Sequence, residues 1–123
     1  MTESRTVTLA TVDHGDVTLP EPAWCIGHED HVPQYRADLT HSGGRVYLER
    51  DGRHVGEAVV AQAPCAVRST REIEGSVVLS YEPPGGMGPA AVRALADDLE
   101  VHAVRLRAFA DELAALRGGG EAP

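Results

Sequence analysis

The last quarter of the chain constrains the fold most, because it carries apolar side chains at alternating spacings of three and four residues. This pattern predicts one long helix over residues 89–117, with Pro89 at its first turn and Gly118 directly after its end. Such a stripe is typical of a helix seam that meets a partner. The residues of the stripe are Val92, Leu95, Leu99, His102, Leu106, Phe109, Leu113 and Leu116.

Two interpretations of the stripe stay open, because the sequence predicts no second helix. In the first, the stripe packs across a sheet of the same chain. In the second, part of the helix pairs with another copy of the chain and forms a homodimer. His102 interrupts the apolar stripe. It is either a pH-sensitive or register-setting residue, or a histidine at the edge of the seam whose ring is hydrogen bonded to a neighbouring carboxylate or carbonyl.

The rest of the chain alternates between apolar and polar residues in short segments, which predicts strands. Asp51-Gly52 lies between two such segments and predicts a hairpin with a type I′ turn. We therefore expect an α+β fold, in which an antiparallel β-meander of five to six strands packs against one long C-terminal helix. The predicted strands cover residues 5–12, 16–19, 35–40, 45–50, 53–61 and 76–82, with a turn at 41–44.

The length of 123 residues predicts one domain, which we expect over residues 1–117. The domain consists of the meander at 5–82, with a loop rich in cysteine and histidine at 23–43, and of the helix at 89–117. Residues 118–123 are glycine-rich and predict a disordered tail.

The charge of the chain excludes several classes of partner. The 123 residues hold 11 basic and 19 acidic side chains, which gives a formal net charge of -8. This balance disfavours direct binding to nucleic acid or to an anionic membrane surface. The sequence has neither a run of about 18 apolar residues nor a secretion signal. With two cysteines and no such signal, we expect a cytoplasmic protein with reduced thiols.

The candidate site lies in the segment around Cys25. Cys25, His28 and His31 follow one another at intervals of three residues, and His41 comes ten residues later. Thiolate and imidazole are common zinc ligands, and a structural site needs four of them. His41 is the nearest candidate for the fourth ligand, with Cys65, His14 and His54 as further candidates. In the alternative interpretation, Cys25 is a small buried apolar residue and the histidines are exposed.

The order of these residues resembles a known family. Trp24-Cys25, the following His28 and the later His41-Ser42-Gly43 are similar to a motif in a family of small actinobacterial domains of unknown function. The resemblance covers nearly the whole chain, but its specific part is residues 22–43. It implies the fold and a site made of Cys25, His28 and His41, with His31 less clearly included. It implies no activity.

Three classes of function follow from these features. We expect a non-enzymatic interaction or regulatory module with a structural zinc site, which dimerises through the helix and binds an unidentified protein partner. An acidic inhibitor or partner of a basic, nucleic-acid-binding protein is the first alternative, and a small metal-dependent enzyme is the second. No catalytic residue is predicted, because Glu29 and Asp30 disfavour the thiolate that a nucleophilic Cys25 needs.

Overall fold

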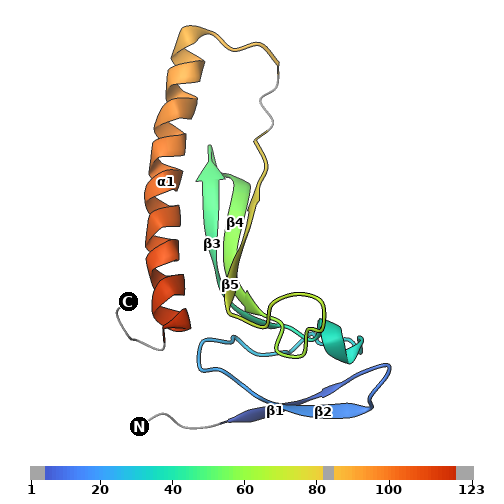
Figure 1. Ribbon diagram of the computed structural model, residues 1–123. Helices are drawn as coiled ribbons and strands as arrows, with labels where there is room; N and C mark the ends of the chain where they lie inside the picture. Colours follow the sequence, from blue (N-terminus) through green and yellow to red (C-terminus); the bar gives the residue numbers. More distant parts are fainter. Residues whose placement is uncertain (1–4, 82–84, 119–123) are drawn as a thin grey trace. The chain divides into compact units, whose positions relative to one another are not determined.

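The computed structural model describes residues 5–81 and 85–118, which form two compact units (Figure 1). Within the described residues, the first unit contains 5–44 and 60–74, and the second contains 45–59, 75–81 and 85–118. The fold is α+β, with two antiparallel sheets of two and three strands and one long C-terminal helix. The described residues therefore form a smaller and divided set of strands, where the sequence predicted one continuous meander.

The first sheet is the predicted N-terminal hairpin. Strand β1 (Thr6–Ala10) pairs with strand β2 (Asp16–Pro20) in antiparallel register, with Val7 opposite Leu19 and Leu9 opposite Val17. Strand β1 ends before the predicted residue 12 because the Thr11 backbone N–H and hydroxyl both donate to the Gly15 carbonyl, which closes the turn, whereas β2 extends one residue beyond its predicted end. Gly15 has a φ of 61°, which glycine adopts without steric cost.

The core of the first unit lies under this hairpin. It consists of buried residues from the hairpin, from the segment before β3 and from the segment after β4, with Val7 and Val17 packed against them. These buried residues are Leu9, Leu19, Leu39 and Cys65. The hairpin thus buries one face and places its ends beside the segment that carries Cys25.

The strand predicted at 35–40 is wrong. A 3-10 helix, η1 (Arg36–Asp38), occupies this segment. The Asp13 carboxylate accepts a hydrogen bond of 2.9 Å from the Arg36 backbone N–H, and the Asp38 N–H donates to the Tyr35 carbonyl at 2.9 Å. These two bonds turn the backbone, so the alternation of side chains at 35–40 does not produce a strand.

The turn predicted at 41–44 is also wrong, because strand β3 (His41–Arg50) begins there. A Cβ on Gly43 would lie 3.4 Å from the Trp24 carbonyl oxygen and 3.4 Å from Cβ of Val60. Glycine in a strand often marks such a close approach. Gly43 therefore allows β3 to lie against the segment around Trp24.

The second sheet has the order β3-β4-β5. Strand β4 (Arg53–Gln62) follows β3 through the predicted hairpin turn, in which Asp51 and Gly52 have φ values of 51° and 76°. This turn confirms the type I′ geometry expected of an Asp-Gly pair. Strand β5 (Glu74–Leu79) lies at the edge of the sheet, and the predicted strand end at residue 82 lies outside the described residues.

Helix α1 (Pro89–Arg117) has the predicted length, and the backbone N–H of Gly118 closes its last turn on the Ala114 and Leu116 carbonyls. The rest of the predicted tail, 119–123, lies outside the described residues. The helix packs along the sheet within the second unit (Figure 1): a Cβ on Gly75 of β5 would lie 2.7 Å from the Phe109 ring. No helix among the described residues is long and apolar enough to cross a membrane.

The predicted stripe faces the sheet over only part of the helix. His102 and Phe109 are buried, whereas Val92 and Leu99 are about half exposed. Val92 and Leu99 are the first and third members of the stripe, and Leu95 between them is half-buried. The sheet therefore covers the stripe only in part toward the N-terminal end of the helix.

Candidate metal centre

Four side chains of the first unit meet in one buried cluster: Glu21, Cys25, His28 and His41. Each offers one potential ligand atom, and all four atoms lie within 4.8 Å of one another. Glu21 directly follows β2, Cys25 and His28 lie between β2 and η1, and His41 is the first residue of β3. The cluster therefore connects the hairpin, the following loop and the start of the second sheet.

Local backbone contacts fix the loop that carries Cys25. The Cys25 N–H donates to the Pro22 carbonyl at 3.0 Å, and the Ile26 N–H donates to the Ser42 carbonyl at 3.0 Å. Nη2 of Arg5 donates to the carbonyls of Pro22 and Cys25, both at 3.2 Å. The loop is thus attached to β3 on one side and to the residue preceding β1 on the other.

Gly27 directs a backbone donor onto the sulfur atom. Its φ of 105° lies in a region that side-chain-bearing residues rarely adopt. In this conformation the Gly27 N–H donates to Sγ of Cys25 at 3.5 Å. This contact helps to hold Sγ of Cys25 in its place within the cluster.

The distances within the cluster are close to those of a metal site. Oε1 of Glu21 lies 3.0 Å from Nε2 of His28 and 2.8 Å from Nδ1 of His41, and Sγ of Cys25 lies 3.6 Å from Nε2 of His28. Ligand atoms at the corners of a zinc tetrahedron are separated by about 3.3–3.8 Å, given zinc–ligand distances of about 2.0–2.3 Å. The three distances and the upper bound of 4.8 Å for all four atoms place the cluster near the dimensions of a zinc tetrahedron.

His41 provides the strongest indication of a missing partner. Its side chain is 2% exposed, and its Nδ1 has no hydrogen-bond partner among the described residues. The Glu21 oxygen at 2.8 Å is near enough, but the angles are not those of a hydrogen bond. A buried, unsatisfied nitrogen costs about 1–3 kcal/mol. A cation between the nitrogen and the carboxylate would remove that cost.

Burial and charge shift the pKa values of His41 and Glu21 in the directions that suit metal binding. Burial lowers the pKa of His41, although the Glu21 carboxylate opposes this effect, so His41 is neutral at pH 7. Burial raises the pKa of Glu21, but the hydrogen bonds with the side chains of His28 and Cys25 and the electrostatic attraction of His28 outweigh this effect. The pKa of Glu21 therefore lies below its ordinary value, and Glu21 is ionised at pH 7.

The structure brings together three of the four residues predicted at the site, namely Cys25, His28 and His41. His31 lies apart from the cluster, because its Nε2 donates to the Ala10 carbonyl at 2.9 Å. Glu21 is the member of the cluster that the sequence did not predict. Its position between Pro20 and Pro22 indicated only the end of a strand, and the short separation from Cys25 was the one signal for a ligand.

The further candidates for a fourth ligand lie elsewhere. Cys65 is buried in the apolar core of the first unit. His14 pairs with Asp13 at 3.0 Å, and His54, in the second unit, stacks on the ring of Tyr47.

In the second unit, His102 is a fully bonded histidine inside the helix–sheet packing. Its Nε2 donates to the Glu49 carbonyl at 3.0 Å, so the neutral ring accepts the Tyr81 hydroxyl at Nδ1. This arrangement corresponds to the expectation of a ring satisfied by a neighbouring carbonyl. His102 thereby connects α1 to β3 and to Tyr81, which lies after β5.

Residues 6–115 match a family described as a domain of unknown function, DUF6907. Neither a curated protein nor a solved structure matches the chain.

Proposed function

We propose that this chain, which belongs to the DUF6907 family, binds one zinc ion through Glu21, Cys25, His28 and His41. The observation that carries the proposal is the buried Nδ1 of His41, which faces the Glu21 carboxylate at 2.8 Å without a hydrogen bond. The thiolate and the two imidazoles favour zinc over calcium or magnesium, which prefer oxygen ligands.

The role that we propose for the ion is structural. Four protein ligands fill a tetrahedral zinc site, and the side chains of Glu21, His28 and His41 are 7%, 10% and 2% exposed. The ion would hold the loop after β2 against the first residue of β3. Because His41 comes from β3 and the other three ligands come from the segment after β2, the energy of metal binding would stabilise the fold of the first unit.

Metal content tests this proposal. The untagged protein, purified without chelator, is expected to contain about one zinc ion per chain by mass spectrometry, since a closed four-ligand site binds one ion. Cys25→Ser and His41→Ala are expected to lose the zinc, whereas Cys65→Ala, the matched cysteine control, is expected to keep it. A zinc-free wild type, or loss of zinc in all three variants, would contradict the proposal.

As a second part of the proposed function, we infer that α1 mediates homodimerisation of an interaction module. The supporting observation is the exposure of Val92 and Leu99, two members of the stripe, at 51% and 46%. Heptad-spaced apolar residues that a helix leaves exposed are typical of pairing with another helix.

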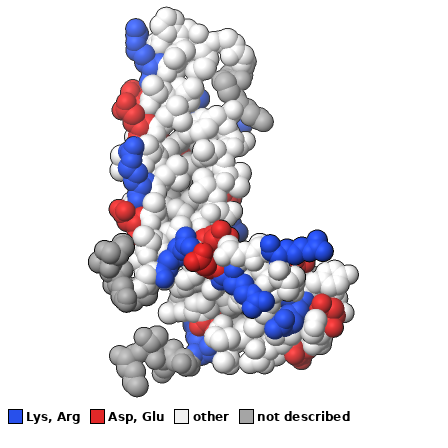
Figure 2. Space-filling model, viewed as in Figure 1, with Lys and Arg blue, Asp and Glu red and all other residues white. Residues whose placement is uncertain are grey.

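The charges along α1 bear on the alternative that the protein is an acidic inhibitor. In Figure 2, blue and red side chains alternate along the edge of the helix, which does not favour an acidic mimic of nucleic acid on that edge.

A further inference from the structure

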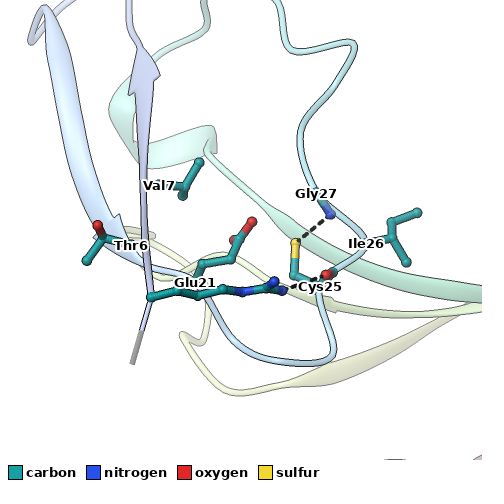
Figure 3. A pocket seen from close by; sticks show the side chains of 7 residues that line it. Thr6, Val7, Glu21, Cys25, Ile26 and Gly27 are labelled. Carbon is teal, nitrogen blue, oxygen red and sulfur yellow. Dashed lines mark hydrogen bonds between the residues drawn. The ribbon is translucent and has the colours of Figure 1, made fainter. Parts of the chain in front are cut away.

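A pocket of about 250 Å³ opens beside the metal centre, and two of the residues that line it, Glu21 and Cys25, belong to that centre. In Figure 3, the carboxylate of Glu21 and the sulfur of Cys25 extend in the same direction, into the space between Val7 and Gly27. Since a water molecule takes up about 30 Å³ of liquid, this volume suits a small organic molecule. The metal is therefore approachable from the side on which Glu21 lies.

Glu21 is the most exchangeable of the four ligands. His28 and His41 do not line the pocket, and Cys25 supplies a thiolate, which zinc holds strongly. The Glu21 carboxylate is the single oxygen ligand, and it reaches the cluster through a flexible side chain. An incoming ligand would therefore replace Glu21 before any other residue.

Arg5 places a positive charge in the same pocket. Its Nη2 donates to the Pro22 and Cys25 carbonyls, so Nε and Nη1 offer further N–H groups that these two bonds do not use. A guanidinium pairs with a carboxylate through two parallel hydrogen bonds. Arg5 is thus placed to receive the Glu21 carboxylate when that side chain leaves the metal.

The charge of the site selects a monoanion. With Cys25 as thiolate and Glu21 as carboxylate, the two ligand charges neutralise a divalent ion. A neutral ligand in place of Glu21 would leave a buried positive charge, and a dianion would leave a negative one; both are costly away from water. A small carboxylate preserves neutrality.

We propose that a small carboxylate ligand enters this pocket, takes the place of Glu21 on the metal and transfers Glu21 to Arg5. The proposal rests on the proposed metal site and extends it. The site then holds its ion permanently through Cys25, His28 and His41 and recognises a carboxylate-bearing small molecule at the fourth position. Exchange of one carboxylate for another leaves the charge of the metal centre unchanged.

The test uses the full chain loaded with Co²⁺, whose visible absorption reports the ligands around the metal. Acetate is the probe, titrated at constant ionic strength against sodium chloride. We expect a saturable spectral change in the wild type. Arg5→Gln is expected to weaken acetate binding by at least about tenfold, because it removes one partner of a charge pair. Arg68→Gln, which removes an exposed arginine outside the pocket, is expected to change nothing.

Glu21→Gln tests the same proposal through a variant that should bind acetate more tightly. A neutral amide competes poorly for the metal, so this variant is expected to bind acetate at least about tenfold more tightly than the wild type does. If Co²⁺ binds but neither the wild type nor Glu21→Gln responds to acetate, the pocket proposal is overturned while the metal site stands. If the wild type takes up no Co²⁺, the metal site itself fails. An acetate response that is equal in wild type and Arg5→Gln also overturns the pocket proposal.

Discussion

The carboxylate of Glu21 lies 2.8 Å from Nδ1 of His41, joining the residue that follows β2 to the residue that begins β3. The two side chains are 7% and 2% exposed, and the contact lacks the angles of a hydrogen bond. A buried pair of this kind is costly by itself, because the nitrogen is unsatisfied. It becomes favourable when both atoms bind the same cation, and this relationship gives the first prediction.

Glu21→Gln is expected to lower zinc affinity by more than about tenfold. Loss of a group that only orients a metal ligand already lowers the affinity by about 10–100-fold, and Glu21 would bind the ion directly. An amide oxygen is neutral and is a weaker zinc ligand than a carboxylate. Competition with a chromophoric chelator measures the affinity. Glu29→Gln removes a neighbouring exposed carboxylate and is expected to leave the affinity unchanged. Equal affinities in the two variants would exclude Glu21 as a ligand.

His31 and His28 are expected to behave differently, although both belong to the spacing that suggested the site. His31→Ala removes the bond to the Ala10 carbonyl and is expected to cost about 1 kcal/mol of unfolding free energy with zinc content intact. His28→Ala removes a ligand and is expected to lose the zinc. Zinc analysis and urea denaturation of both variants measure this. Loss of zinc in His31→Ala would mean that His31, and not Glu21, completes the set.

Gly27→Ala tests the hydrogen bond to the sulfur. A Cβ at this position meets nothing within 4 Å, so the effect comes from the backbone, whose φ of 105° is costly for alanine. Strain of about 1–3 kcal/mol is expected to turn the N–H away from Cys25 and to weaken zinc binding. Gly44→Ala has equally open surroundings and no positive φ, and it is the matched control. Chelator competition that fails to distinguish the two variants would show that the N–H contributes nothing to the site.

The sequence predicted the elements whose causes are local. Asp51-Gly52 specifies its hairpin because its own backbone angles suit the turn, and Pro89 suits the first turn of α1 because its missing N–H needs no partner there. Residues 35–40 were mispredicted because the deciding group, the Asp13 carboxylate, comes from a distant part of the chain. Alternation of side chains contains no information about such a partner.

The same distinction applies to the site. Cys25 and His28 are separated by a spacing that is typical of metal ligands, and His41 was the nearest further candidate. Glu21 is one of 19 acidic residues, and only its short separation from Cys25 distinguishes it from the others. It becomes a candidate ligand only when the hairpin brings the end of β2 next to the start of β3. His31 follows the correct spacing, but the Ala10 carbonyl holds its ring elsewhere.

His102→Ala is expected to destabilise the second unit by about 2–3 kcal/mol, because it removes two hydrogen bonds and leaves the Glu49 carbonyl and the Tyr81 hydroxyl without their partner. Urea denaturation gives the free energy, and hydrogen exchange in α1 shows whether the helix loosens. His54→Ala is the control: its ion pair with Glu49 is more than half exposed, so it is expected to contribute no more than about 1 kcal/mol. A similar, small loss in both variants would show that the contacts of His102 do not hold the helix.

The exposed part of the stripe predicts a dimer that a single charge disrupts. The wild type is expected to sediment as a dimer and Leu99→Glu as a monomer, because each copy would bring a carboxylate into the apolar seam. Val101→Glu is the matched control: Val101 is also exposed, at 51%, but lies outside the stripe, so this variant is expected to stay dimeric. Sedimentation velocity, with zinc content to verify folding, separates the outcomes. A monomeric wild type would mean that the stripe serves only to pack α1 on its own sheet, and that the heptad spacing of Val92 and Leu99 has no partner.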